Sequence, residues 1–117
     1  MGMNTDQLRE YCLSLKAAEE GVKWEHLCFM VREKIFCLAG FEDDSFVCFK
    51  VSPDDFGSLT ERDGIEQAPH FARGQWVVVE KRSSLKNAEW KEYLQRSYNL
   101  VKSKLTKKQQ KEIDELT

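Results

Sequence analysis

The fold is decided by residues 24–51, which read WEHLCFMVREKIFCLAGFEDDSFVCFKV. Every second side chain is strongly apolar along residues 27–31, a period of two that is typical of β-strands. Polar turns at Arg32-Glu33 and at residues 42–44 divide the stretch into three such runs. We therefore predict an antiparallel meander of three short strands.

A helix is predicted before the meander. Asn4 and Thr5 offer capping oxygens, and Gln7 stands three residues after Asn4, in the spacing of a capping box. The apolar residues that follow have the spacing of an amphipathic helix: Leu8, Tyr11, Cys12 and Leu15. We expect this helix to end across Ala17–Gly21, with Gly21 as its stop.

The second half of the chain predicts two more helices around further strands. Ser52-Pro53 followed by two aspartates is a strong helix start. Residues 65–73 are expected to be irregular or weakly extended, and Gln75–Lys81 to form a strand. Candidate caps for the last long helix are Ser83, Ser84 and Asn87, and its inward stripe is predicted as Trp90, Leu94, Ser97, Tyr98, Val101 and Leu105.

These elements predict an α+β domain of two layers, with an antiparallel sheet of about five strands and the order α-β-β-β-α-β-β-α. The chain has 117 residues, a length that suits one domain and excludes a large barrel. We assign residues 1–108 to the domain and 109–117 to a polar tail. No apolar run reaches the roughly 20 residues of a membrane span, and a signal-peptide profile is missing. We therefore expect a cytoplasmic protein without membrane contact.

Catalysis is not indicated by any motif. The sequence has no G-x-S-x-G, no H-E-x-x-H and no glycine-rich phosphate loop. His26 and His70 lack a neighbouring ligand pattern, so we interpret both as structural. The four cysteines form no close C-x-x-C pair: Cys12, Cys28, Cys37 and Cys48. We expect a non-enzymatic domain with no catalytic residues, no metal site and no cofactor.

Charge is unevenly distributed along the chain. Residues 1–66 hold seven basic and fourteen acidic side chains, whereas residues 67–111 hold eleven basic and three acidic ones. The overall net charge is only −2. Such segregation can still produce one positive face on a nearly neutral molecule.

Five segments of the sequence resemble the MmcQ/YjbR family of small bacterial proteins and occur in the same order: LREYCLSL from Leu8, KWEHLCFMVREKIFCLAG from Lys23, FKVSPDDFGSL from Phe49, APHFARGQWVVVE from Ala68 and YLQRSYNLVKSKLTKK from Tyr93. The resemblance implies a frataxin-like or secretion-chaperone-like fold. It also implies binding of double-stranded DNA through paired hairpins, or wings. The basic residues that fit this role are Arg32 and Lys34 on the first hairpin, Arg73, Lys81 and Arg82 around the second, and Lys102 and Lys104 near the C-terminus.

The first hairpin departs from the family pattern, because Arg32-Glu33 stand where glycines are common. Tight turns favour Gly or Asn, so we expect a looser turn here. If the turn nevertheless has two residues, the register places Cys28 opposite Cys37 and Met30 opposite Ile35. In that register we expect both cysteines to be reduced, buried and unreactive.

Two alternatives to DNA binding stay open. The meander is apolar on both faces, with Leu27, Phe29, Phe36 and Leu38 on one side and Cys28, Met30, Ile35 and Cys37 on the other. An uncovered apolar face would bind a second copy or another protein. A frataxin-like fold would also allow iron binding through Asp6, Glu10, Glu19, Glu20 and Glu25. Since Arg9 and Lys16 are interspersed among these carboxylates, we favour a solvated helix face.

Overall fold

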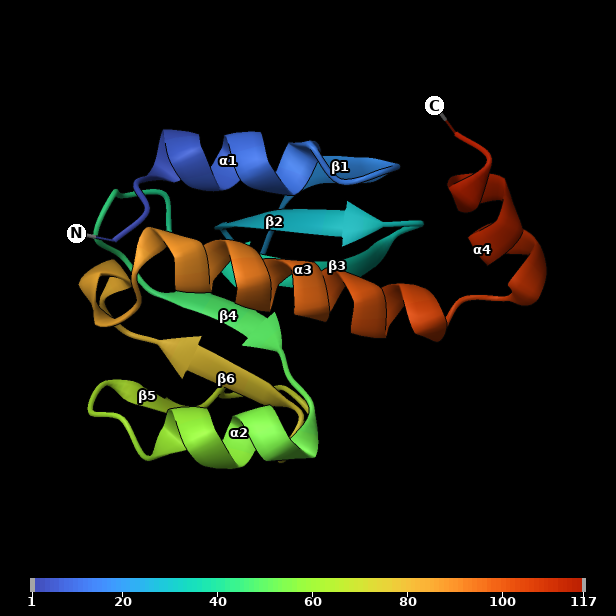
Figure 1. Cartoon of the computed structure of the whole chain (residues 1–117). Helices are drawn as coiled ribbons and strands as arrows, with labels where there is room; N and C mark the ends of the chain where they lie inside the picture. Colours follow the sequence, from blue (N-terminus) through green and yellow to red (C-terminus); the bar gives the residue numbers. More distant parts are fainter. Residues whose placement is uncertain (1, 117) are drawn as a thin grey trace.

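A computed structural model describes residues 2–116 and confirms the α+β class (Figure 1). The described residues form one antiparallel sheet of six strands in the order β1-β2-β3-β4-β6-β5, one more strand than about five. The strands are β1 (Ala18–Lys23), β2 (His26–Val31), β3 (Lys34–Ala39), β4 (Val47–Lys50), β5 (Ile65–Gln67) and β6 (Trp76–Val79). The α-helices are α1 (Thr5–Leu13), α2 (Pro53–Thr60), α3 (Asn87–Ser103) and α4 (Lys107–Asp114), and a short 3₁₀ turn, η1, spans Arg82–Ser84.

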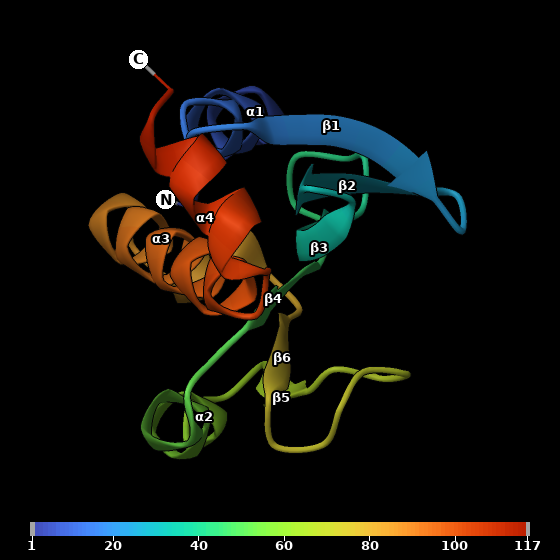
Figure 2. The same cartoon turned by 90° about the vertical axis from the view of Figure 1, so that its right-hand side faces the viewer.

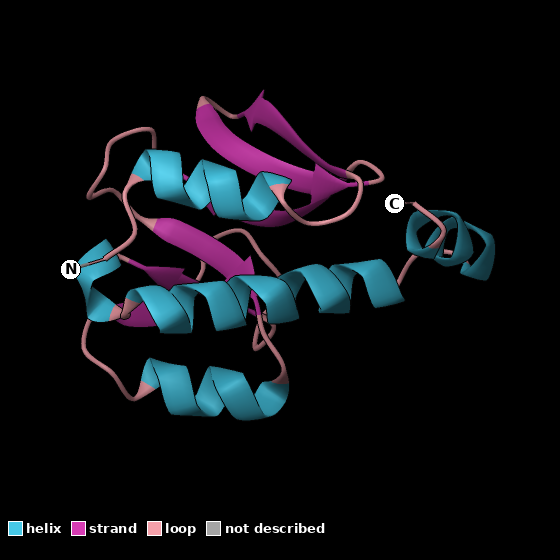
Figure 3. Cartoon of the chain, turned by 45° about the horizontal axis from the view of Figure 1, so that its top comes forward, coloured by secondary structure: helices cyan, strands magenta, loops and turns pink. Residues whose placement is uncertain are grey.

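The helices cover one face of the sheet. Helices α1, α3 and α2 run side by side, and α4 lies beyond the end of α3 (Figure 3). Seen from the side, the helices lie on one side of the sheet, while the β1–β2 hairpin and the β5–β6 loop extend on the other (Figure 2). Trp90 and Leu94 of α3 are fully buried against Phe29 and Phe49 of the sheet. This helix-side core holds the two layers together.

The first helix is shorter than predicted, and a strand follows it. Helix α1 ends at Leu13, and Ala17 turns the chain with a φ of 62°. Residues 18–23 then pair with β2, with Ala18 opposite Val31 and Lys23 opposite His26. This strand was not predicted because its sequence is polar. Strand β1 lies at the edge of the sheet, and most of its side chains are exposed.

The β2–β3 turn is tight, contrary to expectation. Arg32 and Glu33 adopt φ values of 47° and 67°, as the two central residues of a type I′ turn do. Val31 pairs with Lys34 and Met30 with Ile35, as a two-residue turn predicts.

Beyond Met30 the predicted register is wrong. A β-bulge shifts the pairing, so Phe29 faces Cys37 and Cys28 faces Leu38. The extra residue is Phe36, and its carbonyl accepts a hydrogen bond of 2.6 Å from the buried Ser97 hydroxyl of α3. Cys37 consequently joins the helix-side core, and Leu38 moves to the opposite face.

Local capping signals locate two of the helix starts. The Asn4 side chain accepts the Gln7 backbone N–H at 2.8 Å, and Ser52 caps α2. The cap of α3 was predicted wrongly, because Ser83 and Ser84 belong to η1 and the N-cap residue is Lys86. The stripe predicted from Trp90 to Leu105 is buried throughout.

Much of the C-terminal segment is helical and packs against the rest of the domain. Residues 107–114 form α4, so the predicted boundary after residue 108 falls inside a helix. The side chain of Ile113 is fully buried in the helix-side core, and Lys102 of α3 forms an ion pair with Asp114. No helix among residues 2–116 is long and apolar enough to cross a membrane.

Candidate functional site

Five of the seven predicted DNA-contacting residues lie at one end of the sheet, which we call the basic end: Arg32, Lys34, Arg73, Lys102 and Lys104, joined by Lys50. The antiparallel register brings the β2–β3 turn and the β5–β6 loop to the same edge, beside the last residue of β4. Lys102 and Lys104 lie at the C-terminal end of α3, which reaches this edge as well (Figure 1).

Two cations of the basic end, Lys50 and Lys104, lie close enough to repel each other. Burial and the neighbouring Lys104 ammonium both lower the pKa of Lys50. Burial raises the pKa of the Tyr98 phenol, and the nearby charges of Lys102 and Arg32 oppose that rise. Within residues 2–116, Lys102 pairs with Asp114, while the other members of the basic end have no ion-pair partner.

Lys81 and Arg82 do not belong to this surface. Lys81 follows the far end of β6, since β6 starts opposite Lys50 and runs away from it. Arg82 is only 2% exposed, and its prediction as a DNA contact is therefore wrong. A guanidinium enclosed in the protein cannot reach a phosphate without unfolding its surroundings.

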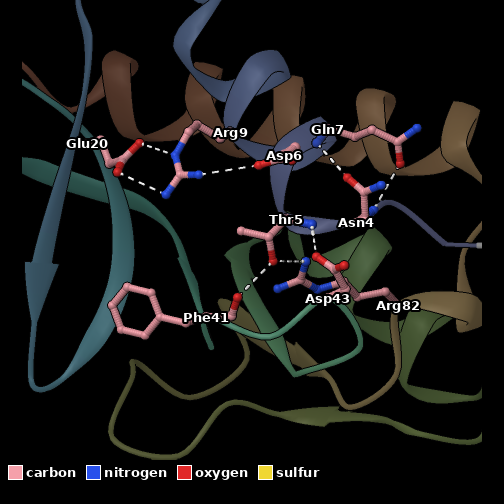
Figure 4. A network of polar contacts seen from close by, with 9 residues as sticks. All are labelled: Asn4, Thr5, Asp6, Gln7, Arg9, Glu20, Phe41, Asp43 and Arg82. Carbon is pink, nitrogen blue, oxygen red and sulfur yellow. Dashed lines mark hydrogen bonds and ion pairs between the residues drawn. The ribbon is translucent and has the colours of Figure 1, made fainter.

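Arg82 instead connects three segments that are distant in the sequence (Figure 4). Its guanidinium donates to the carbonyls of Ser45 and Gly40, each at 3.0 Å, and to the Thr5 hydroxyl at 2.9 Å. Its own carbonyl accepts the indole N–H of Trp90 at 2.8 Å. Burial lowers the pKa of Arg82, and the interior oxygens stabilise the charge that remains.

The acidic residues considered for iron are dispersed. Asp6 and Glu20 both bind Arg9, at 3.6 Å and 2.7 Å (Figure 4). Glu10 lines a hollow between α1 and α3, and Glu25 lies in the β1–β2 turn. Among residues 2–116 no group of three or more His, Cys, Asp or Glu side chains is placed to hold a metal ion.

A second hydrophobic cluster occupies the sheet face that the helices leave open. It consists of Cys28, Leu38, Cys48, Ala68 and Trp76, with the half-buried Met30, Ile35, Phe46, Phe71 and Val78 packed around it. The bulge at Phe36 determines which residues form this cluster, because the shift in register places Leu38 on the open face and Cys37 on the helix side. The sequence correctly predicts that both faces of the meander are apolar.

A pocket of about 750 Å³ opens on this face. Its walls come from the β1–β2 hairpin, the central strands and the β5–β6 loop, and its lining is Trp24, His26, Leu38, Phe46, Cys48, Pro69, His70, Phe71, Val78 and Glu80. Sequence reasoning missed this site, because its members come from five separate segments. The available signal was Trp24, an aromatic residue inside an otherwise polar turn.

All four cysteines are buried, as expected for Cys28 and Cys37. A hydrogen bond with Cys12 and burial together raise the pKa of the Cys37 thiol. Burial raises the pKa of Cys48 to about 12 and also raises that of Cys28. These thiols are therefore poor nucleophiles at neutral pH.

Comparison with known proteins agrees with the fold and with the sequence resemblance. The family profile of YjbR matches residues 13–100, most of the chain. The chain belongs to the YjbR family. No curated protein matches this YjbR domain.

Two solved structures share the fold of this YjbR domain. The crystal structure of Deinococcus radiodurans protein DR2400, with a DUF419 domain, is 25% identical with a TM-score of 0.84, covering 96% of this chain and 88% of its own. A Pseudomonas syringae protein is 22% identical with a TM-score of 0.69, covering 85% and 99%. Both support a small domain whose activity has to be inferred from its own surface.

Proposed function

We propose that this YjbR domain is a non-enzymatic cytoplasmic protein that binds double-stranded DNA with its basic end. The observation that carries the proposal is a group of cations at one end of the sheet, five of which have no ion-pair partner within residues 2–116. Such a group raises the free energy of the isolated protein, and a polyanion lowers it again. Phosphates along a duplex supply negative charge at a matching density.

The geometry supports contact through two loops. The β2–β3 turn carries Arg32 and Lys34, and the β5–β6 loop carries Arg73. Since both loops leave the same edge of the sheet, they resemble the paired wings of the family expectation. Lys104 at the end of α3 extends the positive surface next to them. Contacts of this kind fix the position of a protein on DNA without reading the bases.

Fluorescence anisotropy with a random duplex of about 20 base pairs, at about 50 mM salt, tests the proposal. We expect micromolar binding that weakens steeply as salt increases. The double variant K34E/K104E should bind at least about tenfold more weakly. A plot of the logarithm of its association constant against the logarithm of the salt concentration should also be less steep, its slope being smaller by about 0.9 for each phosphate that the variant no longer neutralises.

The matched control is K81E/K86E, which changes the net charge equally but at the opposite end of the molecule. It should retain affinity within about threefold, because only distant charges change. Absence of binding by the unmodified protein at micromolar concentration would overturn the proposal. Equal losses of affinity in the two double variants would show that net charge, and not the basic end, attracts the duplex.

A second candidate function is self-association through the open face. Met30 and Ile35 contribute to the apolar cluster there and stay half-exposed. Partly exposed apolar side chains in one patch favour association with a similar surface. Sedimentation velocity of the unmodified protein and of Ile35→Glu tests this. We expect a dimer that the variant dissociates, and a concentration-independent monomer would exclude the candidate.

A further inference from the structure

The pocket on the open face has the dimensions of a small-molecule site. Its volume of about 750 Å³ lies within the range of ordinary ligand pockets, which is roughly 300–1,000 Å³. Its lining places it on the sheet face away from the helices. The β1–β2 hairpin and the β5–β6 loop, which both contribute to the lining, extend from the sheet on that side (Figure 2). The basic end contributes no residue to its lining, so the pocket is separate from the proposed DNA contact.

Aromatic rings form much of the wall, and neighbouring rings hold two of them in place. Phe46 packs edge-on against His26 with ring centroids 5.1 Å apart, and Phe71 stacks on Trp76 at 4.3 Å. Because these contacts already fix the rings, little side-chain freedom is lost when a ligand binds.

The third ring is that of Trp24 at the tip of the β1–β2 hairpin. Its side chain is 70% exposed, and its backbone has a φ of 50°. A bulky residue in this left-handed conformation costs stability, and folding alone does not call for tryptophan at an exposed turn. A role in contacting a ligand at the rim accounts for both features.

The charge of the wall selects the kind of ligand. Glu80 is the only Asp, Glu, Lys or Arg in the lining, and no ion pair of residues 2–116 includes it. Lys23 lies opposite His26 in β1 but outside the lining. Aromatic faces attract cations, and a free carboxylate adds to that attraction. An anion finds no Lys or Arg on this wall, where the remaining basic side chains are the imidazoles of His26 and His70.

We propose that this pocket binds a small organic cation, an alkyl or aryl ammonium whose charged nitrogen lies between Glu80 and the aromatic rings. Trp24 covers the ligand from the hairpin side, and Phe46 and Phe71 contact it from the walls. The hydrocarbon part packs on Leu38, Cys48 and Val78 on the floor. Desolvation of a quaternary or alkylated ammonium costs less than that of a bare ammonium ion, which suits such apolar walls.

Three compounds of similar shape test the proposal by NMR titration of the full chain: phenethyltrimethylammonium, 3-phenylpropan-1-ol and 3-phenylpropionate. We expect saturable shifts with the cation, including those of the Trp24 indole N–H, and a dissociation constant of about 1 mM or tighter. The alcohol should bind at least about fivefold more weakly, and the anion should not saturate.

Two variants and their controls assign the interaction to these residues. E80Q should remove most of the preference for the cation over the alcohol, whereas E61Q, at an exposed position after α2, should leave it unchanged. W24A should weaken cation binding about tenfold. The control V22A changes the same hairpin on the other face, because Val22 pairs with Leu27 of the helix-side core.

Equal affinity for the three compounds would overturn the proposal, as would cation shifts that map to residues outside the pocket. Retention of the preference in E80Q would also contradict it. Far-UV circular dichroism of every variant establishes that the fold is intact, and these exposed substitutions are expected to preserve it.

Discussion

Replacement of Arg82 by alanine is expected to destabilise the domain more than any surface change. The guanidinium links the N-terminal segment, the β3–β4 loop and η1 through contacts to Thr5, Gly40 and Ser45. Three of its hydrogen bonds measure 2.9–3.0 Å. Truncation would leave several buried acceptors without a donor, which is costly in a protein interior.

The expected loss of stability follows from those three bonds. A hydrogen bond to a charged group contributes about 1.5–3 kcal/mol, so the three bonds together would contribute roughly 4.5–9 kcal/mol. The desolvation of the buried guanidinium offsets part of this stabilisation, because burial lowers the pKa of Arg82 and disfavours its charged form. We therefore expect Arg82→Ala to reduce the free energy of unfolding by about 4 kcal/mol and Arg82→Lys by about 2 kcal/mol.

Urea denaturation followed by tryptophan fluorescence measures both changes. Lys81→Ala, the exposed neighbour, is the control and should stay within about 0.5 kcal/mol of the unmodified protein. A loss of stability below about 1 kcal/mol in Arg82→Ala would refute the role assigned to this network. If the alanine variant does not fold, the lysine variant still provides the measurement.

Three further predictions concern the C-terminus, the β2–β3 turn and the thiols. Ile113→Ala should cost about 2–4 kcal/mol in urea denaturation, and an unchanged midpoint would show that α4 is not docked. Glu33→Gly should raise the free energy of unfolding by about 1 kcal/mol, because the φ of 67° at this position favours glycine. A lower urea midpoint than that of the unmodified protein would contradict this. Cys48, with its pKa raised to about 12, and Cys37 should resist alkylation at pH 8 in native protein, and stoichiometric labelling within minutes would contradict their burial.

Sequence reasoning succeeded where the determining contacts are local. The cap at Asn4 involves a residue three positions away, and the start at Ser52-Pro53 is decided within one turn. The stripe of α3 was also readable, because burial of one helix face imposes its own period.

The failures depend on contacts between distant segments. The polar strand β1 is stabilised by its pairing with β2, and this pairing cannot be predicted from the composition of β1. The carbonyl of the bulged residue, Phe36, accepts its hydrogen bond from the Ser97 hydroxyl, sixty-one residues later in the chain. For the same reason, composition could not distinguish the buried Arg82 from the exposed Lys81 beside it.

The two outermost strands determine how copies of this domain can meet. At one edge of the sheet β1 carries Glu19, Glu20 and Lys23, and at the other edge β5 has only three residues. Charged or very short margins prevent another chain from continuing the hydrogen-bonded ladder. Growth of sheets across molecules, the route to fibrous aggregates, is therefore blocked on both sides. Any specific self-association of this domain has to be built from side chains on a face and not from backbone pairing.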